Sequence, residues 1–216
     1  MSTVRAADAG GMFIFAFELY TLPGVSRVVK SNPLFMLYAA PEKELLEQMM
    51  TQKDERLLDL TFAQPVMLVF LRQLGCTFCR EALADIAKER KKIEGLGTKI
   101  VLVHMAAAEV AEEFFDKFDL PGIDHISDPE CNYYRSFGLG KGTFTQLFGL
   151  STWIRGFDIG VVRGYGLEYG SHLGDSFQMP GVFILQDGEI KESYIHKLAS
   201  SRPDYHELVK CCVIDA

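Results

Sequence analysis

The chain has 216 residues, of which 48% are hydrophobic and 24% charged, and its formal net charge is −7. This composition supports a packed core and excludes intrinsic disorder as the default state. An acidic chain without a stripe of Lys and Arg lacks the charge that phosphate binding requires, so we predict no nucleic-acid partner.

Residues 1–60 are predicted to form an N-terminal extension. Its apolar run at residues 12–20 is interrupted by Glu18 and is too short to span a bilayer, so we predict no membrane insertion. The run also lacks the basic flank and the small-residue cleavage site of a signal peptide. Pro41 then precedes a stretch with acidic residues in its first turn, which predicts a helix.

A domain over residues 61–216 is predicted from alternating strand and helix patterns. Three strand-like runs come first, at residues 66–71, 99–105 and 123–127. Helical patterns follow them, up to about residue 95, over residues 107–118, and from an expected cap at Asp128. This alternation indicates right-handed crossovers and a parallel arrangement of these strands.

The end of the domain is predicted to be an antiparallel hairpin. Residues 182–186 and 189–195 are strand-like, and Asp187-Gly188 between them is typical of a tight hairpin turn. A final helix is expected near Pro203, capped by Ser200 or Ser201. We therefore predict an α/β fold with a mixed central sheet between flanking helices.

Residues 138–178 fit neither pattern, because they are rich in Gly and aromatic side chains. We predict an insertion packed over one edge of the domain, with short helices near residues 143–150. Its glycines do not form a dinucleotide-binding fingerprint in a strand–turn–helix context. Trp153 and the nearby Phe residues are interpreted as core or lid, with a hydrophobic substrate pocket as the alternative.

Cys76 and Cys79 form a Cys-x-x-Cys motif directly after a buried strand and at the start of a helix. A helix N-terminus stabilises a thiolate, which is the nucleophile in thiol chemistry. Attack by one sulfur on a disulfide or a peroxide can be resolved by the other sulfur. Arg72 and Arg80 flank the motif and would lower the pKa of a thiol there, whereas the acidic residues one turn further, Glu81 and Asp85, would oppose this.

Two other interpretations of the motif stay open, a zinc site and a pair of buried inert cysteines. Zinc needs a second ligand pair, and the sequence has no second Cys-x-x-Cys, while the adjacent Cys211 and Cys212 have poor chelate spacing. We predict no metal and no organic cofactor. The five cysteines are odd in number and sparse, which favours a reducing compartment, and we expect a cytoplasmic protein.

Pro180 stands directly before a predicted strand and far along the chain from the cysteines. This position suggests a cis Met179–Pro180 bond facing the two sulfurs. A trans proline that begins an edge strand is the alternative.

Two segments, FLRQLGCTFCRE at residues 70–81 and QMPGVFILQDGEI at 178–190, resemble the peroxiredoxin-like branch of the thioredoxin superfamily. This is the AhpC/TSA-like group that includes selenoprotein-L-related redox proteins, and the resemblance covers about residues 55–212. It implies a thioredoxin-like three-layer fold and a redox-active pair at Cys76 and Cys79. It also implies a cis proline at Pro180, with Thr77 and Arg80 as neighbouring site residues.

The chain departs from true peroxiredoxins, whose signature is Pro-x-x-x-Thr-x-x-Cys. Superimposing that signature places Cys76 at the Thr, Cys79 at the attacking Cys, and Arg72 where the Pro would stand. The family's later active-site Arg is missing near Met179-Pro180. Similarity to thioredoxin makes Cys76 the attacking thiol and similarity to peroxiredoxin makes it Cys79, and the sequence does not decide between them.

The resulting hypothesis is a thiol–disulfide oxidoreductase, a peroxiredoxin-like antioxidant protein, that cycles Cys76 and Cys79 between dithiol and disulfide. Its oxidant would be a peroxide or a protein disulfide, and its reductant a cellular thiol system. Whether peroxidase or disulfide reductase activity dominates is left open, as is the oligomeric state. The alternative is a redox-inactive thioredoxin-fold module that binds a partner through the aromatic insertion.

The remaining cysteines and histidines carry weaker expectations. Cys131 is interpreted as a lone buried cysteine, with a resolving role as the alternative, and Cys211 and Cys212 are candidates for pairing with another subunit. His104 ends a central strand at the edge where the site should lie. A structural role for His104 is favoured over that of a base.

Overall fold

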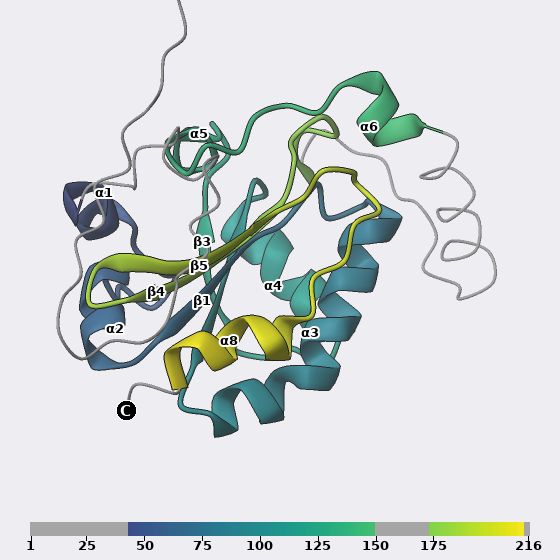
Figure 1. The fold of residues 1–216 in the computed structure, drawn as a ribbon. Coiled ribbons are helices and arrows are strands. Elements are labelled where there is room, and N and C mark those ends of the chain that lie inside the picture. Colours follow the sequence, from purple (N-terminus) through teal and green to yellow (C-terminus); the bar gives the residue numbers. More distant parts are fainter. Residues whose placement is uncertain (1–42, 150–172, 214–216) are drawn as a thin grey trace, which may run out of the picture. The chain divides into compact units, whose positions relative to one another are not determined.

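The computed structural model describes residues 43–149 and 173–213, which belong to one compact unit spanning Leu37–Ala216. A five-stranded sheet with the order β3-β2-β1-β4-β5 lies at its centre (Figure 1). The strands are β1 (Val66–Phe70), β2 (Lys99–His104), β3 (Asp124–Ser127), β4 (Gly181–Gln186) and β5 (Glu189–Ile195). β1, β2 and β3 are parallel, whereas β4 pairs antiparallel with both β1 and β5. The predicted mixed sheet and its closing hairpin are confirmed.

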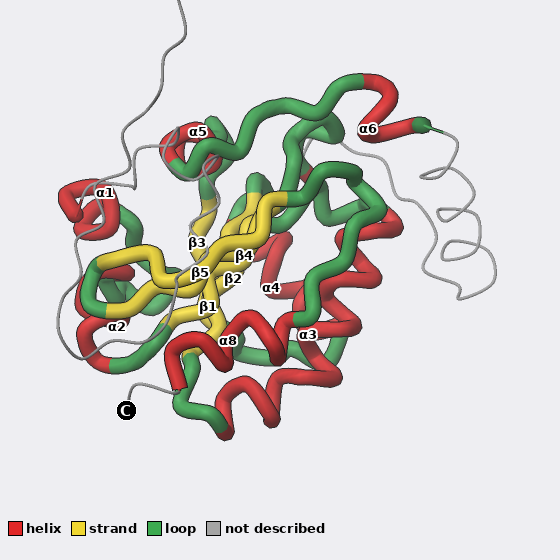
Figure 2. Tube along the Cα trace, in the orientation of Figure 1, coloured by secondary structure: helices red, strands yellow, loops and turns green. Residues whose placement is uncertain are grey.

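Helices cover both faces of the sheet, which gives the three layers of the predicted thioredoxin-like fold (Figures 1 and 2). The described helices are α1 (Lys43–Gln48), α2 (Leu57–Ala63), α3 (Thr77–Gly95), α4 (Ala108–Lys117), α5 (Asn132–Ser136), α6 (Phe144–Phe148) and α8 (Tyr205–Val213). One core contains apolar residues of α3, α4 and α8, and the other contains those of α1, α2 and α5. None of the helices in the described ranges is long and apolar enough to cross a membrane.

The position of the central strand β1 explains why its sequence is continuously apolar. All five of its residues are buried, and successive side chains point to opposite faces of the sheet. Met67 and Val69 enter the core beneath α3, while Leu68 and Phe70 enter the core beneath α2. A strand covered by helices on both faces has no polar side, so the amphipathic alternation of a half-exposed strand is missing.

Two predicted helix caps differ from those in the structure. Asp128 is the expected cap residue of α5, but Cys131 occupies that position in a left-handed conformation with φ 54°. The Asp128 carboxylate nevertheless satisfies the helix start, accepting bonds from the N–H groups of Asn132 and Tyr133, both at 2.8 Å. At α8, the Asp204 carboxylate accepts from Glu207 N–H at 3.0 Å, so neither predicted serine caps this helix.

The expected cis bond before Pro180 is wrong, because no cis peptide bond occurs in the described residues. The trans form is the lower in free energy for an X–Pro bond, by about 0.5–1 kcal/mol, unless a tight turn requires the cis form. Here the chain runs from Met179, whose N–H donates to Gly140 O, directly into β4. No turn at Pro180 requires the cis form.

The outer segments are described only in part. Leu46 of α1 and Leu57 of α2 belong to the predicted extension, and both are fully buried in the same core as Leu68. The domain boundary at residue 60 stays a prediction. Within the predicted insertion, α6 confirms the short helix expected near residues 143–150 and begins with a capping box at Thr143. Trp153 lies outside the described residues.

Candidate active site

The N-terminus of α3 lies at the carboxyl end of β1, and it carries the two cysteines of the motif. Cys76 is the N-cap residue, in extended conformation, and Cys79 lies in the first turn. Both are buried, with exposed fractions of 6% and 3%, and neither forms a disulfide. The strand-to-helix step places the sulfurs where a helix N-terminus favours negative charge.

Arg72 joins the first cysteine to a distant segment of the chain. Its Nη1 donates to Cys76 Sγ at 3.0 Å, and its Nη2 donates to the carbonyl oxygen of Ser176. Arg72 is itself only 6% exposed. A buried guanidinium that donates to a sulfur stabilises that sulfur as a thiolate through a charge-assisted hydrogen bond.

Residues 173–176 pack across the loop that precedes Cys76. Leu74 N–H donates to Leu173 O at 3.1 Å, and Ser176 Oγ donates to Gln73 Oε1 at 3.0 Å. Gly174 has φ 109°, and a Cβ there would lie 2.8 Å from the Cβ of Met105. This segment therefore approaches the sheet edge too closely for a side chain at residue 174.

Cys79 has an environment that keeps its sulfur protonated. Burial raises the pKa of the Cys79 thiol strongly, and the nearby charge of Cys76 raises it further. The charges of Arg72 and Arg80 lower it, without offsetting burial. The two sulfurs are close enough for the charge of one to act on the other, and their environments differ: the Cys76 sulfur accepts a hydrogen bond from Arg72, whereas burial keeps the Cys79 thiol neutral.

A small cavity of about 30 Å³ lies beside Cys79. It is walled by the ends of β1 and β4, the first turns of α3, and the segment between β5 and α8, with Pro180 and His196 among its lining residues. A volume of this size can hold water, since one water molecule needs about 10–15 Å³ by the same measure.

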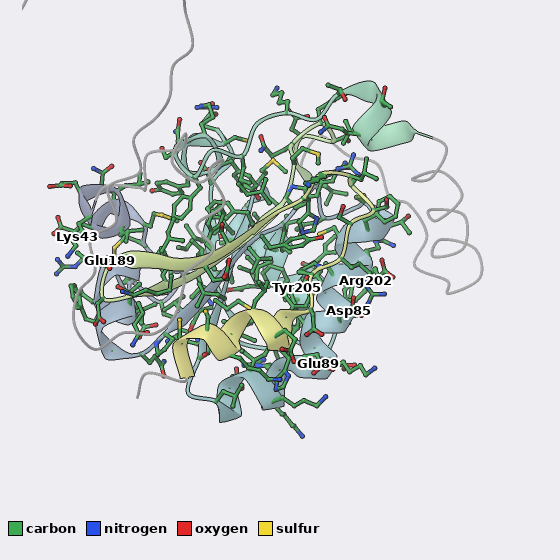
Figure 3. The ribbon with its side chains drawn as sticks, in the orientation of Figure 1. Lys43, Asp85, Glu89, Glu189, Arg202 and Tyr205 are labelled. Carbon is green, nitrogen blue, oxygen red and sulfur yellow. The ribbon has the colours of Figure 1, made fainter. Side chains whose placement is uncertain are left out.

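Arg202 closes the outer side of this cavity. Its Nη1 donates to Glu81 Oε1 at 2.9 Å, and its Nη2 pairs with the Asp85 carboxylate. Figure 3 shows Arg202 and Asp85 together where the segment before α8 passes α3, with Tyr205 at the start of α8 nearby. The two carboxylates expected to raise the thiol pKa are thus neutralised by a cation 117 and 121 residues away in sequence.

The other expected site residues lie at different distances from the sulfurs. Thr77 is the buried first residue of α3, and Pro180 lines the same cavity as Cys79. Arg80 points toward α4, with its Cζ 5.6 Å from the centre of the Phe114 ring. The structure therefore gathers Cys76, Cys79 and Pro180 with Arg72, whereas Arg80 acts on the site through its charge.

The three remaining cysteines lie apart from the motif. Cys131 belongs to the core on the opposite face of the sheet, and burial raises its thiol pKa. Cys211 and Cys212 lie in the last turn of α8, with their sulfurs 3.5 Å apart. Cys131 is thus described as a buried core residue. The predicted pairing of Cys211 or Cys212 with another subunit stays a prediction.

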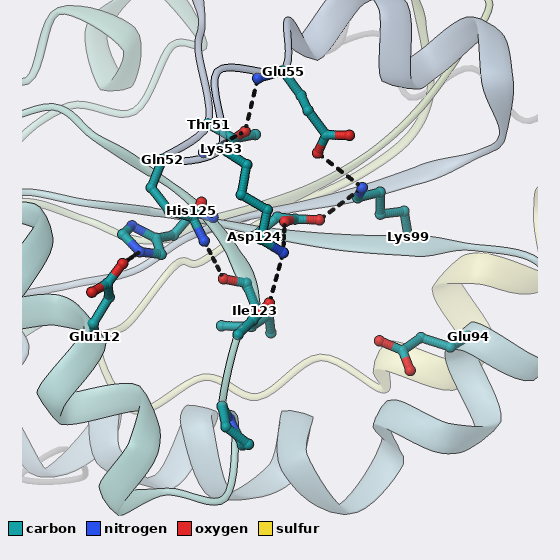
Figure 4. Close-up of polar contacts among 12 residues, drawn as sticks. Thr51, Gln52, Lys53, Glu55, Glu94, Lys99, Glu112, Ile123, Asp124 and His125 are labelled. Atoms are coloured by element: carbon teal, nitrogen blue, oxygen red, sulfur yellow. Dashed lines mark hydrogen bonds and ion pairs between the residues drawn. The ribbon is translucent and has the colours of Figure 1, made fainter.

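His104 is fully buried and does not line the cavity beside Cys79. Its Nε2 lies 2.9 Å from His125 Nδ1. His125 Nε2 in turn lies 3.5 Å from a Glu112 oxygen (Figure 4). Burial, together with a smaller contribution from the charge of His125, lowers the pKa of His104 to about 3. The arrangement matches the structural role favoured for His104.

A charged cluster occupies the opposite edge of the sheet, at the amino ends of β2 and β3. Lys99 pairs with Asp124 at 2.8 Å and with Glu55 at 3.2 Å, and Lys53 pairs with the same aspartate (Figure 4). These contacts hold the loop before α2 against the sheet. In residues 43–149 and 173–213, no three His, Cys, Asp or Glu side chains are grouped so that they could hold a metal ion.

Sequence reasoning did not identify Ser176, His196, Arg202 or Tyr205 as neighbours of the motif. Each comes from a segment 94 or more residues further along the chain than Cys79, and each is an ordinary residue type in a loop or a helix start. The antiparallel pairing of β4 with β1, together with contacts made by the loops on either side of this hairpin, brings these segments to the cysteines. No local spacing in the sequence signals that proximity.

Comparison with known proteins agrees with this geometry. The AhpC/TSA family model matches residues 38–193, more than half of the chain. The curated Arabidopsis thaliana protein named "Thioredoxin-like protein AAED1, chloroplastic" is 23% identical over 161 residues, 71% of this chain, which spans 64% of that relative's length.

Two solved structures share the fold. Peroxiredoxin Q of Xanthomonas campestris has a TM-score of 0.53 at 13% identity, with 83% of this chain and 94% of that chain covered. Peroxiredoxin 6 of Arenicola marina, solved as a cysteine-to-serine mutant, also has a TM-score of 0.53, at 12% identity, with 77% and 67% covered.

Proposed function

The chain belongs to the AhpC/TSA family, and from this membership we propose that it is a thiol-dependent oxidoreductase that reduces peroxide and forms a Cys76–Cys79 disulfide. Membership in this family points to thiol-based redox chemistry in general. The hydrogen bond from Arg72 Nη1 to Cys76 Sγ carries the more specific proposal. This contact supports the proposal that Cys76 is the attacking sulfur.

In the first step, the Cys76 thiolate attacks one peroxide oxygen. The O–O bond breaks, the sulfur becomes a sulfenic acid, and the leaving hydroxide takes up a proton and becomes water. Arg72 supports this step because it donates to the sulfur from a buried position. Desolvation strengthens that interaction, since the effective dielectric constant is lower inside the protein than in water.

In the second step, Cys79 resolves the sulfenic acid. Its sulfur displaces hydroxide from Cys76, a disulfide forms, and water is released. A neutral Cys79 thiol in the resting site suits this order of events, because it does not compete for the oxidant. Two equivalents of a small thiol, or one of a dithiol, then return both cysteines to the reduced state and leave oxidised as a disulfide.

Peroxide is the proposed oxidant because both sulfurs are nearly fully buried. A protein disulfide would have to displace residues 173–176 to reach Cys76, whereas a molecule the size of hydrogen peroxide needs little more room than water. The reductant is proposed to be a cellular thiol system. We also propose a cytoplasmic location, on the ground that the cysteines are sparse and odd in number.

The test is sulfenic acid trapping in two single variants, Cys76→Ser and Cys79→Ser, treated with hydrogen peroxide and a dione reagent. We expect Cys79→Ser to trap one reagent molecule at Cys76 and Cys76→Ser to remain unmodified at Cys79. Trapping at Cys79 alone would reverse the assignment and favour the peroxiredoxin-like order. No trapping in either variant would overturn the proposed peroxidase activity.

The burial of both sulfurs is also the observation that favours the alternative, a redox-inactive binding module. In that case the cysteines would be core residues, and both would resist peroxide and alkylating reagents in the folded protein while reacting in denaturant. The trapping experiment therefore discriminates between the two proposals. An inert pair in the native protein supports the binding module.

A further inference from the structure

We propose that His196 is the base that accepts the proton of Cys79 when the disulfide closes. This inference rests on the proposed function, and it adds a residue that neither the motif nor the family model assigns a role. It starts from a requirement of the second step. A neutral Cys79 thiol must lose its proton before or while its sulfur attacks Cys76.

His196 and Cys79 both line the small cavity of about 30 Å³. A proton can pass between them through water held in this cavity. His196 directly follows β5, and its N–H donates to Pro180 O at 3.4 Å. Its ring packs edge-on against Tyr194, with centroids 5.0 Å apart and an interplanar angle of 83°. These contacts hold the imidazole in place.

One ring nitrogen of His196 has no hydrogen-bond partner among the residues that the structure describes. Its Nδ1 is fully buried and makes no hydrogen bond with the part of the chain that the structure describes. His196 as a whole is 9% exposed. A buried polar nitrogen without a hydrogen-bond partner is unfavourable, so its presence in the lining of the same cavity as a thiol needs an explanation. Accepting the thiol proton provides one.

The protonation states of the two groups fit this transfer. Burial lowers the pKa of His196 to about 4, so the imidazole is neutral and able to accept a proton at physiological pH. Cys79 holds its proton because burial raises its pKa. The proton moves uphill in the resting site, and it can do so as the S–S bond begins to form.

The other charged and titratable groups that line the cavity are less suited to the task. They are Arg72, Cys79 itself, Glu81, Asp85, Arg202 and Tyr205. Glu81 and Asp85 are ion-paired with Arg202, so their carboxylates are already engaged by a cation. Burial raises the pKa of the Tyr205 hydroxyl, which stays protonated, and the two arginines are cations.

The step balances without any further reagent. His196 takes the proton of Cys79, and the Cys79 sulfur attacks the Cys76 sulfenic acid, so that an S–S bond forms and the S–O bond breaks. The leaving hydroxide takes the proton back from the imidazolium and becomes water. His196 ends neutral, and the only oxidant consumed is the peroxide of the first step.

The test separates the two steps in time. The full chain is mixed with hydrogen peroxide, quenched at intervals with acid, and analysed by mass spectrometry for sulfenic acid at Cys76 and for the disulfide. In His196→Gln we expect the rate of sulfenic acid formation to match the wild type and the rate of disulfide closure to fall by about 100-fold, as for loss of a general base. The matched control is His206→Gln, in α8, which should change neither rate.

The pH dependence of disulfide closure distinguishes a base at His196 from a purely structural role of this residue. Wild-type closure should vary little between pH 6 and 8, whereas closure in His196→Gln should rise about tenfold per pH unit, because hydroxide must then remove the proton. His196→Asn provides a second variant, and an unchanged first step shows that a variant is folded. A variant with wild-type closure and pH profile would overturn the inference. A wild type without sulfenic acid would instead overturn the proposed function.

Discussion

The guanidinium of Arg72 connects two parts of the site, since it donates both to Cys76 Sγ and to the Ser176 carbonyl. A flat group with several fixed donors can serve two acceptors at once, which a single ammonium cannot do in the same geometry. Arg72 is therefore both the hydrogen-bond partner of the Cys76 sulfur and a residue that holds the segment 173–176 beside it. The proposed reactivity depends on this one side chain.

Replacement of Arg72 should slow the first step. We expect Arg72→Leu to lower the rate of peroxide reaction at Cys76 by about 10- to 100-fold at pH 7, because a hydrogen bond to a charged group contributes about 1.5–3 kcal/mol. Arg72→Lys should retain part of the rate. Stopped-flow kinetics of thiol loss give the measurement.

The matched control for Arg72 is Arg90→Leu, which removes a cation from an exposed i,i+4 pair with Glu94 on the same helix as the cysteines. Its rate should equal that of the wild type. If Arg72→Leu also reacted at the wild-type rate, Arg72 would have no role in activating Cys76.

At the residue scale, the sequence predicted the cysteine pair and its neighbouring arginine, because strand, motif and helix start are contiguous. It did not predict His196, whose imidazole follows an edge strand with no motif around it. The cis bond expected at Pro180 was wrong, because neither the position of the proline nor a resemblance determines the local turn geometry. A role that depends on contacts between distant parts of the chain can therefore be inferred only from the structure.

Two helix starts depend on carboxylates: Asp204 stands at the usual N-cap position of α8, whereas Asp128 lies before the N-cap residue of α5. The clearest is α5, where Asp128 accepts three backbone N–H groups while the N-cap residue, Cys131, offers no side-chain bond. Tyr134 of this helix donates to the carbonyls of Leu71 and Val103, at 2.5 and 3.0 Å. The helix thereby supports the carboxyl edge of the sheet that carries the site.

Removal of the Asp128 carboxylate should destabilise the fold. We expect Asp128→Ala to lower the free energy of unfolding by about 1–2 kcal/mol, the usual cost of a lost cap. Asp204→Ala, at the start of α8, is the comparison, since that carboxylate accepts a single N–H, and it should cost less. Urea unfolding at pH 7 measures both. Equal losses would show that the three contacts of Asp128 do not act together.

The segment before α8 is predicted to limit access to Cys79. Replacing Arg202 with Met breaks its pairs with Glu81 and Asp85 and opens the outer side of the cavity. We expect alkylation of Cys79 in the folded protein to become at least about fivefold faster, since local opening would cost about 1 kcal/mol less. Mass spectrometry of the alkylated protein gives the rate.

Lys210→Met is the control for Arg202→Met, because it breaks an exposed i,i+3 pair on α8 away from the cavity. It should leave the alkylation of Cys79 unchanged. An unchanged rate in Arg202→Met would mean that this ion pair does not restrict access to the cavity.

The elements themselves were largely predictable because their patterns are local. Strands buried on both faces appear as unbroken apolar runs, and Asp187-Gly188 marks the hairpin turn. The caps were less predictable. Asp128 reaches forward across a left-handed residue to serve its helix, and nothing in the order of side chains reveals that geometry.

Buried histidines give the whole molecule a stability that depends on pH. Burial lowers the pKa of His104 to about 3 and that of His196 to about 4, while a histidine in the unfolded chain titrates near its ordinary value of 6.5. Below pH 6.5 the unfolded state therefore binds more protons than the folded state. The contribution of these histidines to the free energy of unfolding is therefore complete above pH 6.5, and it is lost as the pH decreases toward 4.

Lowering the pH from 7 to 5 should cost up to about 2 kcal/mol for each buried histidine, at about 1.4 kcal/mol per pH unit below 6.5. We expect the loss between these two pH values to be smaller in His104→Gln than in the wild type. The partly exposed His206 provides the control, and His206→Gln should lose as much unfolding free energy between pH 7 and 5 as the wild type. Urea midpoints at both pH values give the answer, and an identical loss in His104→Gln would contradict the assignment of a buried neutral histidine.

One measurement tests the proposed redox pair most directly. Trypsin cleaves after Arg72 and Arg80, so the peptide of residues 73–80 contains both Cys76 and Cys79. The reduced protein is treated with one equivalent of hydrogen peroxide, alkylated and digested, and this peptide is weighed. We predict a loss of two hydrogen atoms, no alkyl groups, and recovery of the dialkylated peptide after dithiol treatment. A peptide that carries two alkyl groups after peroxide, with the oxidation found at Cys211 and Cys212 instead, would contradict the account.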